Sequence, residues 1–345
     1  MPESDLDVEE ENDEEIYSAE YKISTYGADY TIEILSKKLE NKEILIPSFQ
    51  RKFVWDLKKA SKLIESFLLG LPVPQIFLYR EEESQNLLVI DGQQRLKSIN
   101  YFLEGIWENG NAFKLKGVLS KWNGKTIKDL SEAEKRKLNN SVLRASVFEQ
   151  TAPEDNNSSM FQIFERLNSG GVTLTQQEIR DCIYHGEIVP FLSELNDYNP
   201  WREILNKKLP DRRAKDVELI LRILSLYDDW EHYDKPMRDF MNRWMKKKRN
   251  LSKEEQDKFK KVFYKVIDAV SDRLGSKAFR PVRSVSLPVV DSVFVALAKT
   301  ENISEAITHY DELLKDEEYL KNIKGATTDV DVVNVRIQRA INILK

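Results

Sequence analysis

The sequence has few cysteines, few histidines and no long apolar run, and each deficit excludes a class of protein. Cys182 is the single cysteine among 345 residues, which excludes a disulfide framework and a cluster of thiolate metal ligands; we expect it to be a small core residue. The histidines His185, His232 and His309 lack zinc-site spacing, and no Ser/His/Asp or Cys/His grouping supports acyl transfer. No apolar run approaches the roughly 18 residues of a membrane span, and the N-terminus has no signal-peptide pattern. We therefore expect a soluble, cytoplasmic protein without membrane contacts.

Charge is distributed unevenly along the chain. The net charge is −5, but the first twenty residues hold ten acidic and no basic side chains, so the rest carries 53 Lys and Arg against 48 Asp and Glu. Residues 1–20 are expected to be a disordered acidic tail, because they cannot bury enough apolar surface to fold. An alternative is that the tail mimics nucleic-acid phosphates and folds over a basic groove. The body alone is not basic enough to indicate DNA binding.

Capping and turn signals divide the chain into an α+β part and a helical part. Asp56 can cap a helix that Gly70 ends, and Thr175 with Glu178 forms a capping box. The other elements expected in the first part are a hairpin of Gln75–Arg80 and Leu87–Ile90, a helix over Gln94–Leu103 with Gly105 beyond it, a strand over Ser141–Glu149 and a helix over Ser158–Leu167.

From Asp216 onward the apolar spacing is almost entirely helical. Ser252 and Glu255 form a second capping box, and Gly275 ends the helix that follows. The expected helices are 216–230, 234–249, 252–274, 287–299, 303–315 and 328–344. The sequence thus predicts an α+β domain over 21–200 and a helical domain over 201–345, with the boundary near 195–215.

The run from Leu88 to Arg95 is the first candidate site, because it reads as a strand, a sharp turn and a helix start. A helix N-terminus attracts phosphate, Gly92 permits close backbone approach, and Arg95 offers a bidentate fork. Gln93 and Gln94 could orient a water or a base edge. Alternatively, Asp91 is only a helix cap and Arg95 only a surface residue.

Two further clusters could serve the same site. Arg51 could reach phosphates and Trp55 or Phe53 could stack a base, although aromatic residues near a helix start often pack in the core. Glu165 and Asn168 lie one helical turn apart and suit Mg²⁺, unless they only end a helix before Gly170 and Gly171.

Four ordered motifs carry a family resemblance. They are I-P-x-F-Q-R-x-F-V-W at residues 46–55, L-P-V-P-Q-I-F at 71–77, V-I-D-G-Q-Q-R-L at 89–96 and F-E-R-L-N-S-G-G-V-T-L-T-Q-Q-E-I-R at 164–180. Together they resemble the N-terminal domain of GmrSD-type modification-dependent restriction enzymes, which is similar to the ParB/sulfiredoxin nucleotide-binding fold. The resemblance covers about residues 30–185.

The resemblance implies a nucleotide and phosphate site at Asp91, Gly92, Gln93, Gln94 and Arg95, flanked by Gln50 and Arg51. It also implies that Glu165 and Asn168 hold the nucleotide's metal, and that nucleoside-triphosphate hydrolysis regulates the cleavage of modified or foreign DNA. The large members carry a histidine-rich HNH nuclease domain, whereas residues 195–345 contain only His232 and His309. A separate nuclease subunit or a purely regulatory role is therefore implied.

The sequence thus predicts a Mg²⁺-dependent nucleoside triphosphatase that regulates a DNA-directed restriction or phage-defence system. Arg95, Arg51 and Gly92 would hold phosphates, Trp55 and Gln50 would flank the nucleotide, and Asp91, Gln93 or Gln94 would position the attacking water. The choice among GTP, ATP and CTP stays open, as does assembly into a homo-oligomer. The alternative function is a non-catalytic nucleic-acid-binding or scaffolding subunit.

Overall fold

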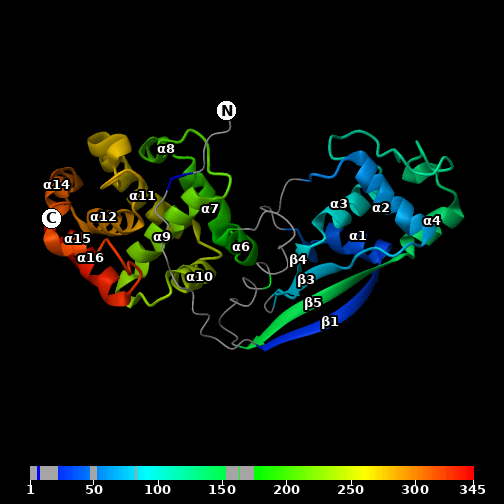
Figure 1. Cartoon of the computed structure of the whole chain (residues 1–345), viewed down its shortest axis with the longest axis horizontal. Helices are drawn as coiled ribbons and strands as arrows, with labels where there is room; N and C mark the ends of the chain where they lie inside the picture. Colours follow the sequence, from blue (N-terminus) through cyan, green and yellow to red (C-terminus); the bar gives the residue numbers. More distant parts are fainter. Residues whose placement is uncertain (1–5, 8–21, 47–52, 82–83, 153–162, 164–174) are drawn as a thin grey trace. The chain divides into compact units, whose positions relative to one another are not determined.

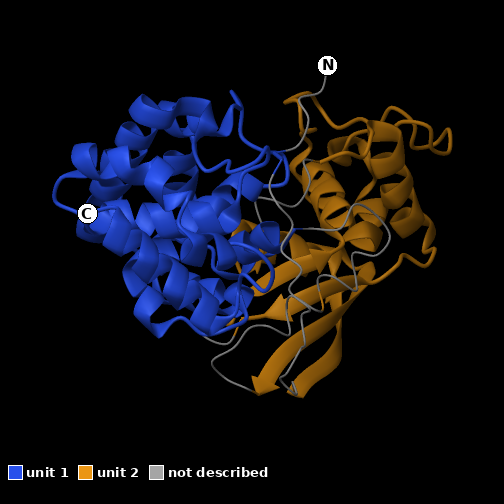
Figure 2. Ribbon diagram, turned by 60° about the vertical axis from the view of Figure 1, so that its left-hand side comes forward, with its two compact units in different colours: residues 1–18, 175–345 blue, residues 19–174 orange. Residues whose placement is uncertain are grey.

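The computed structural model describes residues 6–7, 22–46, 53–81, 84–152, 163 and 175–345. The chain forms two units, and each is described by itself. We call residues 19–174 the first unit, which is unit 2 (orange) in Figure 2, and residues 1–18 with 175–345 the second unit, which is unit 1 (blue) there. Among the residues just given, no helix is long and apolar enough to cross a membrane. The structure confirms an α+β N-terminal region followed by a helical one.

The first unit is built on a mixed five-stranded sheet with the order β1-β5-β3-β4-β2 (Figure 1). The strands are β1 (Lys22–Thr31), β2 (Ile44–Leu45), β3 (Ile76–Arg80), β4 (Leu87–Asp91) and β5 (Val142–Ala152). The helices are α1 (Ile32–Glu40), α2 (Leu57–Leu69), α3 (Gln93–Glu104), α4 (Glu132–Asn139) and the 3-10 turn η1 (Ile127–Asp129). The β1–β5 and β3–β4 pairs are antiparallel, whereas β3–β5 and β2–β4 are parallel.

The core of this unit lies between one face of the sheet and the helices, which Figure 1 shows on one side of the strands. Alternate residues of β5, such as Leu143 and Ala145, are buried while Arg144 between them is exposed, as the two-residue period of a strand requires. The helices contribute Ile64 and Leu96 to the same cluster. The apolar residues that recur with the strand period and with the helix period therefore pack together in one apolar layer.

The capping signals and the hairpin are confirmed. Asp56 accepts a hydrogen bond from the Lys59 backbone N–H (2.7 Å), and Gly70 ends α2 in the left-handed conformation. The strands β3 and β4 pair antiparallel, as the two apolar runs predicted. The expected Ser158–Leu167 helix lies outside the described residues except for position 163.

Two elements of the first unit were not anticipated from the sequence. The strand β1 is mostly exposed, and its apolar alternation is limited to Tyr26, Ala28 and Tyr30, which pack partly buried against the core; it is ordered by pairing with β5 along its length. The helix α1 follows directly, capped by Thr31, and contains only nine residues. Both depend on partners that are distant in the sequence.

The second unit consists of helices. They are α6 (Gln176–Ile183), α7 (Ile188–Asn196), α8 (Asn199–Leu205), α9 (Lys215–Asp229), α10 (Met237–Lys247), α11 (Lys253–Leu274), α12 (Leu287–Lys299), α13 (Ile303–Ala306), α14 (Tyr310–Leu313), α15 (Glu317–Lys321) and α16 (Val330–Ile343), with the short 3-10 turns η2 (Trp230–His232), η3 (Gly275–Lys277) and η4 (Ile307–His309). The capping boxes at Thr175 and Ser252 are confirmed. The single helix expected over 303–315 is wrong, because α13, η4 and α14 replace it.

A buried ion cluster joins three helices of this unit. The Asp291 carboxylate on α12 accepts hydrogen bonds from Arg222 Nε (2.8 Å) and Nη2 (2.9 Å) on α9, and from Arg336 Nη2 (2.9 Å) on α16. All three side chains are at most 5% exposed. Charges removed from water are tolerated only when they are paired in this way, so the cluster fixes how α9, α12 and α16 meet.

The two units divide after Leu174, earlier than the boundary near 195–215 that the sequence indicated. Helices α6, α7 and α8 pack against α9 and α11. Arg180 on α6 is fully buried, donating to Glu218 (2.7 Å) and Asn242 (2.8 Å). Leu6 and Asp7, within the expected tail, also make contacts in the helical unit.

Candidate functional site

The candidate site is the junction between β4 and α3. Gly92 takes the N-cap position of α3 with φ +107°, a conformation that favours glycine. The first hydrogen bond within the helix runs from the Leu96 N–H to the Gly92 carbonyl (2.9 Å), and no side chain of the N-cap residue bonds to the first turn. Asp91 is therefore the last residue of the strand and not the helix cap. A 12-residue helix with this start directs its positive end toward the turn.

Gly92 is also in close contact with the strand beside it. A Cβ atom added to this glycine would lie 2.3 Å from Ile76 Cγ2 and 2.8 Å from Ile76 Cβ. Ile76 is fully buried at the start of β3. The close approach that the glycine permits in this structure is thus an internal contact between β3 and the turn.

Arg95 holds the turn together. Its Nη2 donates to Asp91 Oδ2 (2.5 Å) and its Nη1 donates to the Pro74 carbonyl (2.9 Å). The Arg95 side chain is 13% exposed and that of Asp91 is 47% exposed. The pair therefore presents a carboxylate to solvent with the guanidinium recessed beneath it, and it joins the motif at 71–77 to the motif at 89–96.

Gln94 joins a third motif to the same turn. Its Oε1 accepts hydrogen bonds from the backbone N–H groups of Val54 (3.0 Å) and Trp55 (3.2 Å). The side-chain carbonyl is occupied by these bonds, so only the amide NH₂ could face a ligand. Gln93 is buried, with 7% of its surface exposed. These positions do not present two glutamine side chains side by side to solvent.

The aromatic residues of the 46–55 motif have different environments. Phe53 is buried and makes edge-to-face contacts with Tyr101 (5.3 Å) and Trp107 (5.2 Å), which is the core packing that the sequence left open. Trp55 is half-buried, and the Lys59 ammonium lies 4.8 Å from its ring centre. Of the two aromatic residues of this motif that the structure describes, Phe53 and Trp55, only Trp55 retains a surface on which a base could stack.

The remaining predicted site residues are not placed by the structure. Gln50 and Arg51 lie outside the described residues, and so do Glu165 and Asn168. Within the described parts of the chain, no group of three His, Cys, Asp or Glu side chains could hold a metal ion. Cys182 is buried on α6, as expected.

The structure adds polar and aromatic neighbours to which the sequence assigned no role. Phe77 pairs with Asp91 across β3 and β4 and with Ser146 across β3 and β5. Its ring stacks on that of Phe148 at 5.9 Å. Ser146 Oγ donates to Gln75 Oε1 (3.3 Å). Phe77 and Gln75 belong to the motif at 71–77, which is the one signal that could have indicated them.

The first unit is therefore a mixed α+β unit in which the end of strand β4 leads directly into the N-terminus of helix α3. Residues 32–185 match the family model of the GmrSD restriction endonuclease, N-terminal domain. The match begins at α1 and ends just after α6, and it includes all four motifs, so the resemblance seen in the sequence is confirmed. A comparison with curated proteins gave no match. The matched domain points to a component of a restriction or phage-defence system.

Proposed function

We propose that this chain binds a nucleoside triphosphate at the β4–α3 turn and hydrolyses it with Mg²⁺, as the regulatory component of a DNA-directed restriction system. The observation that carries the proposal is the helix start at Gly92. Its first turn receives no side-chain cap from the N-cap residue, and Arg95 lies within that turn. Helix N-termini with a nearby arginine bind phosphate through backbone N–H groups, the helix dipole and a bidentate fork.

The Asp91–Arg95 pair gives the site a way to respond to its ligand. An arginine held by one carboxylate oxygen and one carbonyl can exchange the carboxylate for phosphate oxygens, which it binds in the same geometry. Asp91 would then be released beside the bound phosphate, where it can orient the attacking water. Phosphoryl transfer requires mainly such placement together with charge stabilisation. Gln94 would contribute only its amide NH₂, and buried Gln93 would shape the pocket wall.

The proposal assigns the remaining roles as the sequence did. Arg51 and Gln50 flank the phosphates, and Trp55 offers its half-exposed face to the base. Glu165 and Asn168 support Mg²⁺, which needs only one or two protein ligands beside phosphate and water. The match to a restriction-enzyme domain supports this set because all four motifs fall within residues 32–185.

The test is a thermal-shift and phosphate-release screen of GTP, ATP and CTP with Mg²⁺. A nucleotide at 100 times its dissociation constant should add about 2.7 kcal/mol to the free energy of unfolding. Arg95→Ala should weaken binding by about 1.5–3 kcal/mol, since a charge-assisted contact is lost. Arg144→Ala is the matched control, because Arg144 forms an exposed pair with Asp29 in the same unit (3.0 Å). Equal nucleotide binding by wild type and a folded Arg95→Ala protein would refute the site.

One observation favours a second function, that of a non-catalytic nucleic-acid-binding or scaffolding subunit. The Arg95 guanidinium and the Gln94 carbonyl are both occupied by bonds that tie three motifs together. On this interpretation the turn is a structural junction, and the chain binds DNA or its partner without turnover. Salt-dependent DNA affinity in the absence of nucleotide, combined with no phosphate release, would select this function over the first.

A further inference from the structure

Two loops of the helical unit carry an excess of positive charge that the function proposed above does not use. Residues 206–215 contain the acid Asp211 and five basic residues, and residues 275–286 contain no acid and three basic residues. The eight cations are Lys207, Lys208, Arg212, Arg213, Lys215, Lys277, Arg280 and Arg283. We call these two segments together the basic loop pair. Its charge contrasts with the near balance of the other residues in 21–345, which have 45 Lys and Arg against 47 Asp and Glu.

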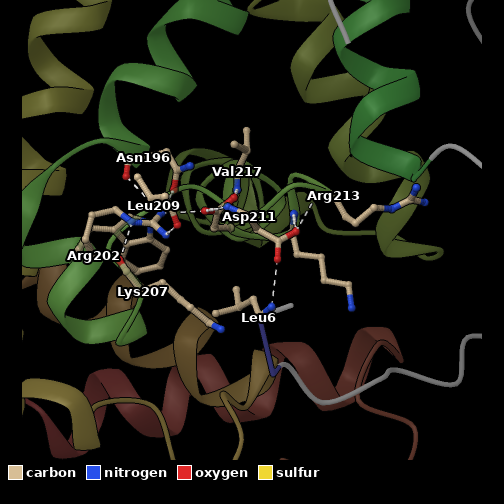
Figure 3. Close-up of polar contacts among 11 residues, drawn as sticks. Leu6, Asn196, Arg202, Lys207, Leu209, Asp211, Arg213 and Val217 are labelled. Atoms are coloured by element: carbon tan, nitrogen blue, oxygen red, sulfur yellow. Dashed lines mark hydrogen bonds and ion pairs between the residues drawn. The ribbon is translucent and has the colours of Figure 1, made fainter. Parts of the chain in front are cut away.

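The two loops are adjacent and firmly built. Arg280 joins them, because its Nη1 donates to the Ile204 carbonyl (2.7 Å) and its Nη2 to the Leu205 carbonyl (3.2 Å) at the end of α8. A buried ion pair of Arg202 and Asp216 (2.7 Å) organises the first loop from inside. Arg202 Nη2 donates to the Leu209 carbonyl (2.7 Å), as Figure 3 shows. The exposed cations therefore stand on a backbone that is already fixed.

The N-terminal segment contacts this surface at two residues. The Leu6 N–H donates to Asp211 Oδ2 (2.9 Å; Figure 3), and the Val285 N–H donates to the Asp7 carbonyl (3.1 Å), so the segment bonds to both loops. Leu6 is 3% exposed. The Asp7 carboxylate acts electrostatically on the Arg280 guanidinium. Leu6 thus serves as an apolar anchor inside a sequence that is otherwise strongly acidic.

We propose that the basic loop pair binds the phosphate backbone of DNA, and that the acidic N-terminal segment, anchored by Leu6 and Asp7, competes with DNA for it. Glu9, Glu10 and Glu11 follow the anchor within four residues in the sequence, so the chain itself tethers their charges to it. A tethered competitor acts at a high effective concentration. The charge complementarity of tail and loops identifies the partner as a polyanion, and the match to a restriction-enzyme domain selects DNA.

The experiment measures the affinity of the full chain for a short labelled DNA duplex by fluorescence anisotropy, without nucleotide, at several salt concentrations. Leu6→Asp removes the anchor and adds a negative charge. A tail-neutral variant, with Glu9, Glu10, Glu11, Glu14 and Glu15 changed to Gln and Asp13 to Asn, keeps the anchor and removes six of the ten negative charges of residues 1–20. A loop variant combines Lys208→Glu, Arg212→Glu and Arg283→Glu, and all three positions are exposed. Its control reverses three exposed lysines elsewhere in the same unit, through Lys258→Glu, Lys261→Glu and Lys324→Glu.

Both tail variants should bind DNA roughly tenfold more tightly than wild type, the first despite its added negative charge. Adding the loop changes to Leu6→Asp should cancel the gain and lower the dependence of log affinity on log salt by about 2.7, for three lost phosphate contacts. The control changes should leave most of the gain. Unchanged affinity in both tail variants would overturn the proposal, as would equal binding by the loop and control variants. Neither readout involves the nucleotide turn, so an Arg95→Ala protein should behave like wild type in this assay.

Discussion

Gly92→Ala tests how the β4–α3 turn is built, because the added Cβ atom should destabilise the fold in two independent ways: through backbone strain and through a steric clash. The added Cβ would lie 2.3 Å from Ile76 Cγ2, a distance that real Cβ atoms do not reach, and the residue would have to keep φ near +107°. The backbone term costs about 1–2 kcal/mol for an L-residue. Overpacking against a fully buried side chain adds about 1–3 kcal/mol. We expect Gly92→Ala to lower the free energy of unfolding of the first unit by about 2–5 kcal/mol.

The two terms can be separated with variants that the chain itself offers. Gly110 also has positive φ (+81°) but nothing within 4 Å of its added Cβ, so Gly110→Ala should show the backbone term alone, about 1–2 kcal/mol. Ile76→Ala removes the methyl group that the new Cβ would meet. In a double-mutant cycle, Gly92→Ala and Ile76→Ala should therefore be less than additive by about 1–2 kcal/mol.

Hydrogen exchange of the β4 and α3 amides is the suitable assay, because it reports on the first unit without averaging over the helical one. Nucleotide binding should be measured on the same variants under conditions in which each is folded. If Gly92→Ala costs no more than Gly110→Ala and shows no coupling to Ile76, the packing account of this turn is wrong. A folded Gly92→Ala protein that has lost only nucleotide binding would instead show that the glycine serves the ligand.

Four further predictions concern the rest of the chain. Asp291→Ala should lower the free energy of unfolding of the helical unit by about 3–5 kcal/mol, because Arg222 and Arg336 lose their shared carboxylate; denaturant unfolding measures this, and a loss below about 1 kcal/mol would contradict it. Burial raises the pKa of Asp181 from its ordinary 3.8 to about 7, so the stability it contributes is present below pH 4 and is lost as pH rises through 7. Asp181→Asn keeps an acceptor for Gln177 and should flatten the dependence of melting temperature on pH between about pH 4 and 7, the interval between the two pKa values; an unchanged slope would exclude Asp181 as its source. Glu165→Gln and Asn168→Ala should abolish Mg²⁺-dependent phosphate release without lowering the melting temperature, less than additively because they share one ion; lower melting with normal hydrolysis would remove the metal assignment. The isolated chain should not cleave modified or plain DNA with Mg²⁺ or Mn²⁺, and cleavage abolished by substitutions in this chain would refute that expectation.

The parts of the fold and of the site that could be predicted from the sequence are those that depend on local signals or on the family resemblance. Asp56, Gly70 and the two capping boxes act within one helical turn, so their bonds depend on neighbours that the sequence places beside them. The hairpin of β3 and β4 joins runs only a few residues apart. The turn at Gly92 was likewise visible, because a strand, a glycine and a helix start are consecutive.

The partners of the site residues could not be read in the same way. Arg95 was expected to face phosphate, yet in the structure it bonds to Asp91 and to the Pro74 carbonyl, 21 positions away. Gln94 bonds to the backbone at Val54 and Trp55, about 40 positions away. These bonds exist because the folded sheet brings three motifs together at the β4–α3 turn. No local pattern in the sequence specifies which distant residues meet there.

The sequence by itself determined the two-part architecture, most helix ends and the order of the four motifs, because capping, periodicity and turn chemistry act over a few residues. Tertiary structure alone decided that β1 is a strand, that α6 to α8 join the helical unit, and that Leu6 is buried and bonds to Asp211. Each of these outcomes depends on contacts between segments far apart in the chain. An exposed strand forms its hydrogen bonds only when folding brings a partner strand beside it. In the same way, an apolar residue in an acidic tail becomes buried only when folding supplies a surface against which it can pack.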